Sequence, residues 1–175
     1  MPRFSPILCD ILQSQENILW RIKNMKLAEA LIERADLQKK ISQICVRMKK
    51  NAKTQEGEKP AEDIVDLTLT FENAASKLET LIKNINRTNN ATPFKEGTLA
   101  DAIAGRDALR MRTKTYRELY EAALAKQDRY ARLEIKYVRC VDTAKLQEKI
   151  DALSKQFRQL DTAIQSTNWT TELLS

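Results

Sequence analysis

The sequence predicts a mainly α-helical fold, in which elongated antiparallel helical hairpins form a four-helix coiled-coil bundle. The chain has 175 residues, is 42% hydrophobic and 31% charged, and contains only 3 Gly and 4 Pro. It therefore lacks the frequent turn residues that an all-β fold needs. Apolar residues also recur at three- and four-residue spacing over four long stretches. At this length we expect a single helical bundle domain over residues 25–175.

Charge and residue types narrow the class of protein. The formal net charge is +6, with cations and anions interspersed, a balance that permits anionic partners without requiring them. There is no histidine, and Cys9, Cys45 and Cys140 are widely spaced, so we expect no metal site, no cofactor and no His-based catalysis. No run approaches the ~20 apolar residues of a membrane span. Asp10 and Glu16 interrupt any secretory signal, so we expect a cytoplasmic protein.

Residues 1–24 are expected to be an N-terminal extension with two interpretations. In the first, translation begins instead at Met25, and the preceding residues are not made in the native host. In the second, they form a short amphipathic helix that Ser5 caps, with Pro6 at its first position.

The first helical hairpin is predicted from two consecutive apolar seams. We expect helix one from about Met25 to Lys53, a polar turn over residues 51–59, and helix two beginning at Pro60. A short turn between two long seams favours an antiparallel hairpin. Arg34 interrupts the first seam, and its guanidinium either extends to solvent or meets a carboxylate of another helix. The seam residues are Leu27, Ala30, Arg34, Leu37, Ile41, Ile44 and Met48, then Ile64, Leu67, Phe71, Ala74, Leu78, Leu81 and Ile85.

A polar stretch follows at the middle of the chain. Its Asn and Thr residues, up to Thr92, are poor helix formers, so we expect helix two to end there in a loop, with Pro93 and Gly97 marking the break. Thr98 and Asp101 then form a capping-box pattern that begins helix three. We interpret the polar side chains around this junction as a helix junction, a subunit interface or a ligand site. This candidate polar cluster consists of Asn86, Arg87, Thr88, Asn89, Thr98, Arg106 and Asp107.

Helix three should extend to about Lys126, and it opens the most basic part of the chain. From Arg106 to Arg139 there are ten Lys or Arg against five Asp or Glu, which indicates either a solvated helix face or an anion-binding face. The candidate anion-binding residues are Arg110, Arg112, Lys114, Arg117, Arg129, Arg132 and Arg139.

Residues 127–141 fit two structures. Leu133, Ile135 and Tyr137 alternate with charged residues as in a half-exposed strand, and a helix fits nearly as well. We favour a short β segment at 130–141, which would need a partner strand and could find one in a second subunit.

Asp142 is expected to cap helix four, whose apolar seam is again regular. Trp169 stands in a polar C-terminal setting and is expected to anchor the tail on its own or a neighbouring subunit. The apolar seam of helix four consists of Leu146, Ile150, Leu153, Phe157, Leu160 and Ile164.

Several fragments together resemble a known family. They are Met25 to Leu31, Ile85 to Asn89, Gly97 to Leu99, Arg106 to Leu109, Glu134 to Lys136 and Asn168 with Trp169. In this order they resemble the septicolysin-like family of small uncharacterised bacterial proteins, over about Met25 to Leu173. Family members begin near Met25, which implies that residues 1–24 lie outside the shared part. The resemblance implies a helical bacterial protein without an established activity, and the name suggests a cytolysin.

The favoured function is that of a structural or interaction protein, a homo-oligomer of helical hairpins. Its alternative is binding of nucleic acid or another polyanion, without sequence specificity, through the basic face at 106–139. A second alternative is cytolysin-like membrane activity. Catalysis would rest on the candidate polar cluster, with Arg and Asn binding an anion and Asp107 acting as a base. Without histidine or a glycine-rich phosphate loop, we expect no enzyme.

Overall fold

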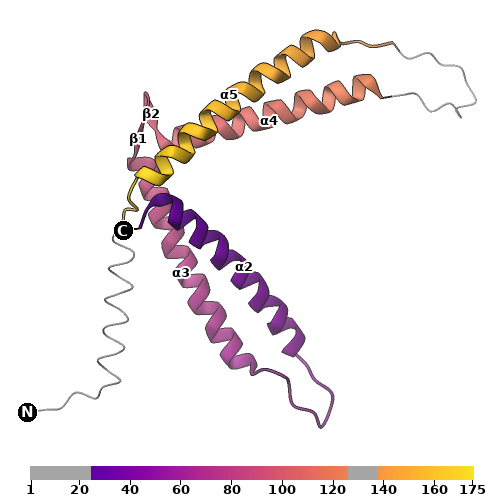
Figure 1. Cartoon of the computed structure of the whole chain (residues 1–175). Helices are drawn as coiled ribbons and strands as arrows, with labels where there is room; N and C mark the ends of the chain where they lie inside the picture. Colours follow the sequence, from indigo (N-terminus) through magenta and orange to yellow (C-terminus); the bar gives the residue numbers. More distant parts are fainter. Residues whose placement is uncertain (1–24, 126–137) are drawn as a thin grey trace, which may run out of the picture. The chain divides into compact units, whose positions relative to one another are not determined.

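The computed structural model describes residues 25–125 and 138–175. Within these ranges the chain forms four long helices and one two-stranded hairpin (Figure 1), so the prediction of a mainly helical fold is confirmed. The chain divides into two compact units. Of the described residues, the first unit contains those up to Pro93 together with Thr167–Ser175, and the second contains those from Phe94 to Ser166. In the described part, no helix has the length and apolar character to cross a membrane.

Two of the expectations fall on residues that the structure does not describe. The N-terminal extension at 1–24 lies wholly outside the described ranges. The candidate β segment at 130–141 lies outside them as far as residue 137, and residues 138–141 adopt no strand.

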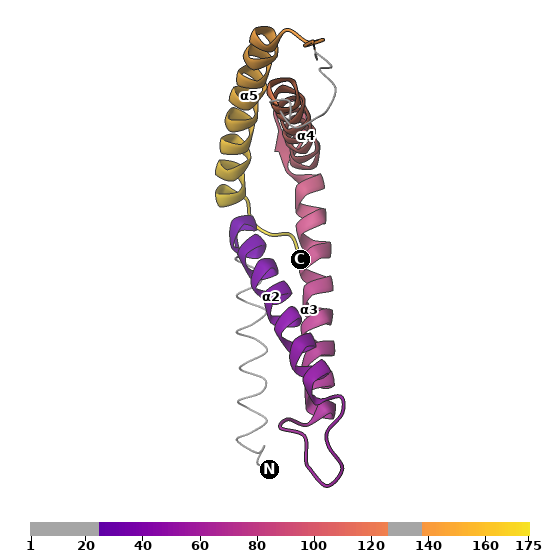
Figure 2. The ribbon, with the colours of Figure 1, turned by 90° about the vertical axis from the view of Figure 1, so that its right-hand side faces the viewer.

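The first unit is built on an antiparallel hairpin of helix α2 (Leu27–Asn51) and helix α3 (Ile64–Ala91). Figures 1 and 2 show the two helices side by side, and their Cα atoms approach within 8 Å along the hairpin. The predicted seams face each other in this contact. Their buried members are Leu27, Ala30, Ile44, Leu67, Ala74, Leu81 and Ile85.

Helix α3 differs from its prediction at both ends. It begins at Ile64 rather than Pro60, because the Asp63 carboxylate caps it by accepting a 2.7 Å hydrogen bond from the Val65 N–H. It also continues through the polar stretch to Ala91, so the expected loop there was wrong. The Thr88 hydroxyl donates to the Asn84 carbonyl, and Thr88 itself is buried. Because the helix propensities of Asn and Thr are only tenths of a kcal/mol worse than average, such packing overrides them.

A hairpin of strand β1 (Pro93–Phe94) and strand β2 (Gly97–Thr98) follows α3. The sequence predicted the chain break here but no strand pair. Lys95 turns the chain with a φ of 51°, a left-handed conformation that non-glycine residues adopt mainly in tight turns.

The second unit contains helix α4 (Leu99–Leu124) and most of helix α5 (Thr143–Thr170). The two run antiparallel, but their Cα atoms hardly come within 8 Å of each other, so long side chains bridge them. Asp142 caps α5 as predicted, with Oδ1 accepting from the N–H groups of Ala144 and Lys145 at 3.0 and 3.2 Å. The buried apolar residues of the two helices include Leu99, Leu146 and Ile150.

The C-terminal segment of the first unit runs beside the start of α2. The Leu27 N–H donates to the Thr171 carbonyl at 2.9 Å, and the Leu173 N–H donates to the Met25 carbonyl at 2.8 Å. Leu173 is buried, whereas Trp169 is 56% exposed. Within the chain, Leu173 therefore takes the buried position in the tail, and the expectation that Trp169 anchors the tail on its own or a neighbouring subunit stays a prediction.

Candidate anion-binding groove

The members of the candidate polar cluster belong to different units. In the first unit Thr88 is buried, Asn86 and Arg87 are exposed, and Asn89 is half-buried. The remaining members, Thr98, Arg106 and Asp107, lie in the second unit.

Thr98 is the N-cap residue of α4. Its hydroxyl accepts a 3.2 Å hydrogen bond from the Asp101 N–H, and the Asp101 carboxylate accepts a 2.9 Å bond from the Thr98 N–H. These reciprocal bonds form the predicted capping box. The hydrogen bond from the Thr98 hydroxyl, at 2.7 Å, lowers the pKa of Asp101 below its ordinary value, and the backbone bond adds to this effect.

Arg106 bridges α4 and α5. Its guanidinium contacts the neighbouring Asp107 at 2.8 Å, and its NH1 group lies 3.5 Å from the Asp161 carboxylate on α5. Arg106 is the less exposed partner in both pairs, so its charge is balanced in a partly desolvated position. This arrangement gives Arg106 a structural role in holding α4 to α5.

Beside this bridge, α4 and α5 enclose a half-open groove of about 670 Å³. The groove exists because the two helices stay apart, and residues at helical spacing on each side line it. Its lining residues are Arg110, Thr113, Lys114, Arg117, Glu118 and Glu121 from α4, and Ser154, Phe157 and Arg158 from α5.

The cations of the groove differ in how their charges are balanced. Arg117 donates a 3.2 Å hydrogen bond to the Ser154 hydroxyl, and Lys114 lies 3.7 Å from the Glu118 carboxylate. Within the described residues, Arg110 and Arg158 form no ion pair at 4.0 Å or less. Two arginines from opposing helices thus share one groove without a carboxylate partner, and this end of the groove is suited to an anion.

The other predicted anion-binding residues lie elsewhere. Arg112 is exposed and does not line the groove. The Arg139 Nε donates a 3.2 Å hydrogen bond to the Ala123 carbonyl near the C-terminus of α4, where the helix dipole favours a cation. Arg129 and Arg132 lie outside the described residues.

Sequence reasoning missed the contribution of α5 to the groove. Ser154 and Arg158 are an i, i+4 pair on one face of α5, and Phe157 was assigned only to the apolar seam. The sequence offered one signal for this contribution. The i, i+4 spacing puts Ser154 and Arg158 on one face of α5, and an antiparallel hairpin could place that face opposite the basic face of α4. Without the register of the two helices, that signal cannot be distinguished from an ordinary solvated helix face.

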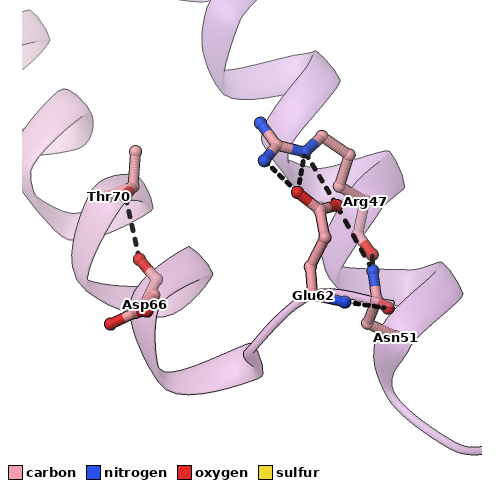
Figure 3. Close-up of polar contacts among 5 residues, drawn as sticks. All are labelled: Arg47, Asn51, Glu62, Asp66 and Thr70. Carbon is pink, nitrogen blue, oxygen red and sulfur yellow. Dashed lines mark hydrogen bonds and ion pairs between the residues drawn. The ribbon is translucent and has the colours of Figure 1, made fainter. Parts of the chain in front are cut away.

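A second polar cluster, formed by Arg47, Asn51 and Glu62, links α2 to the loop that precedes α3 (Figure 3). Arg47 binds both carboxylate oxygens of Glu62, and Asn51 accepts a 3.1 Å hydrogen bond from the Glu62 N–H. The hydrogen bond from Arg47 lowers the pKa of Glu62 below its ordinary value, and Glu62 raises the pKa of Arg47. Figure 3 also shows Thr70 donating to the Asp66 backbone carbonyl one turn along α3. These contacts close the loop, and Arg47 also lines a shallow, open hollow with Lys39 and Val46 of α2.

The fold and the groove define a mainly helical hairpin protein, and comparison with known proteins places it in a family. Residues 34–173 match the model of a family of unknown function, DUF6847, so the chain belongs to that family. A crystal structure described as a functionally unknown conserved protein from Corynebacterium diphtheriae is 41% identical, with a TM-score of 0.81. The similarity covers 86% of this chain and 99% of that one. No curated protein matches the chain. Neither description mentions septicolysin, so that resemblance stays a prediction.

Proposed function

We propose that this protein is a homo-oligomeric interaction protein that self-associates through the α2/α3 hairpin. The observation that supports this proposal is the incomplete burial of the predicted seams. Large seam side chains in the middle of the hairpin stay half-buried, because two helices can cover only one stripe of each other. These half-buried residues are Leu37, Ile41, Met48, Phe71 and Leu78.

The outward faces of the hairpin also carry apolar side chains. Ile32 on α2 is 55% exposed, and Leu69 on α3 is 62% exposed. Single exposed apolar residues are normal on monomers. Together with a half-open seam, however, they give the hairpin apolar surface that association would remove from water.

A second copy of the chain is the partner that fits this surface. An isologous contact brings the same seams together, and two hairpins then form a four-helix arrangement with one enclosed core. Arg34 supports this choice, because it is a half-buried cation on the seam that forms no ion pair within the described residues. A carboxylate from the facing copy would satisfy this group and fix the register of the contact.

Two variants on neighbouring positions of α3 test the proposal. Phe71→Lys places a charge on the half-open seam, whereas Thr70→Lys adds the same charge on the exposed side. We expect sedimentation velocity to show dissociation of Phe71→Lys and an unchanged assembly for Thr70→Lys. Circular dichroism checks that both variants stay helical. An assembly that resists Phe71→Lys while remaining helical would contradict the proposed interface.

A second candidate function is binding of nucleic acid or another polyanion through α4. Its support is that Arg110, Lys114 and Arg117 of the predicted basic face line a single groove. Glu118 and Glu121 line the same groove and would repel a phosphate backbone passing along it. The test is titration with single-stranded DNA at increasing salt, because phosphate contacts predict affinity that falls steeply as salt rises.

A further inference from the structure

Arg110 and Arg158 form one basic end of the α4/α5 groove. The ion pair of Arg106 with Asp161 and the hydrogen bond of Arg117 with Ser154 set the register of the antiparallel helices. In this register Arg110 lies between Arg106 and Arg117, and Arg158 lies between Ser154 and Asp161. The two arginines therefore lie within about one helical turn of the same level, and both line the groove.

Like charges at nearly the same level of a groove repel each other, and a bound anion would remove this cost. Within the described residues neither Arg110 nor Arg158 has an ion-pair partner, whereas Arg106 and Lys114 each contact a carboxylate. A guanidinium presents its donors as a planar fork that matches two oxygens of a phosphate. Two such forks from opposing helices suit a compact dianion better than a single carboxylate.

The rest of the groove limits the size and character of the ligand. Its volume of about 670 Å³ falls within the range of about 300–1,000 Å³ that small-molecule sites occupy. Phe157 lines it as a half-buried ring, which offers an apolar surface. Glu118 and Glu121 line the groove on α4 one to two turns beyond Thr113, and they disfavour a second phosphate there.

We propose that this groove binds a small organic phosphate ester, with the phosphate between Arg110 and Arg158 and an apolar group against Phe157. The Ser154 hydroxyl, which Arg117 holds in place, is a further hydrogen-bonding group for such a ligand. The proposal does not depend on self-association, because its residues all belong to α4 and α5.

Calorimetric titration of the full-length chain with phenyl phosphate tests the site. We expect saturable binding that Arg158→Gln weakens about tenfold or more, because a hydrogen bond to a charged group contributes about 1.5–3 kcal/mol. Arg112→Gln removes the same charge from a position that does not line the groove and should leave the affinity within about twofold, because Arg112 is not placed to contact the phosphate and its distant charge is screened. No saturable binding of phenyl phosphate, or an equal loss in both variants, would overturn the proposal.

Two further titrations distinguish a phosphate ester from inorganic phosphate and from nucleic acid as the ligand of the groove. Phe157→Leu should weaken phenyl phosphate and leave inorganic phosphate unchanged, because only the ester contacts the ring. An oligothymidylate should bind less tightly than phenyl phosphate. Tighter binding of the oligothymidylate, lost again in Arg158→Gln, would assign the groove to nucleic acid and overturn the small-ligand proposal.

Discussion

The backbone N–H of Leu174 donates a 2.9 Å hydrogen bond to the hydroxyl of Thr88. The same hydroxyl donates to the Asn84 carbonyl at 2.7 Å, so one buried oxygen satisfies groups from two parts of the first unit. The bond joins residues 86 positions apart in the sequence. It fastens the C-terminal segment to α3.

Replacing Thr88 by Val should destabilise the protein without changing the shape of this contact. Valine fills nearly the same volume but offers no acceptor, so the Leu174 N–H loses its partner. An unsatisfied group of this kind costs about 1–3 kcal/mol. The free energy of unfolding from urea denaturation, at fixed protein concentration, measures the loss.

Thr80→Val is the matched control for this prediction. Thr80 also lies on α3 and donates to a carbonyl one turn earlier, but it is exposed and bonds no other segment. Its substitution should change the free energy of unfolding by about 0.5 kcal/mol or less. Equal effects of the two substitutions would show that the bond to Leu174 contributes nothing.

The pair of Arg47 and Glu62 should make stability depend on pH in the acidic range. Arg47 holds the pKa of folded Glu62 below its ordinary value. The contribution is therefore fully present above the unfolded pKa, about 4.3, and is lost as pH falls through the lower folded pKa. Glu62→Gln should lower the melting temperature at neutral pH, by an amount that shrinks towards zero on acidification.

Glu58→Gln is the control for the pH prediction, since Glu58 lies exposed in the same loop. Its melting temperature should follow that of the unchanged protein at every pH. A difference between Glu62→Gln and the unchanged protein that stays constant through the acidic range would contradict the assigned role of Arg47.

Thr98→Ala should weaken the start of α4. The substitution removes the hydroxyl that accepts from the Asp101 N–H, and loss of such an N-cap costs about 0.5–2 kcal/mol. Thr115→Ala, at an exposed position in the interior of α4, should be neutral or slightly stabilising because alanine is the better helix former. Hydrogen exchange should become faster over the first turn of α4 in the Thr98 variant alone.

Arg106→Leu should loosen the contact between α4 and α5. A double-mutant cycle with Asp161→Asn isolates the pair from other effects of each change. We expect a coupling energy of about 0.2–1 kcal/mol, because the two groups are partly exposed and lie 3.5 Å apart. Additive effects of the two substitutions on the free energy of unfolding would show that the bridge is not energetically coupled.

The helices could be predicted from the sequence because their apolar seams repeat over many turns. Capping by Thr98 and Asp142 was also predictable, since each residue acts on its own helix. The end of α3 was not, because burial of Ile85 and Thr88 outweighs weak local propensities. The buried position of Leu173 was not predictable either, since it depends on backbone pairing with Met25, far away in the sequence.

The candidate sites, like the helices, could be predicted only where the residues of a single helix decide them. The basic face of α4 was visible in the sequence, but its partner Arg158 was not, because the antiparallel register with α5 decides which side chains share the groove. The candidate polar cluster was predicted from proximity in sequence. Its members instead contact different elements, as Thr88 with Leu174 and Arg106 with Asp161 illustrate.

The mass of the native chain in solution, measured by light scattering over a dilution series, tests self-association most directly. We predict an integer multiple of the single-chain mass, and a melting temperature that falls on dilution because association stabilises the folded state. A single-chain mass at every concentration, with a melting temperature independent of dilution, would contradict the proposed assembly.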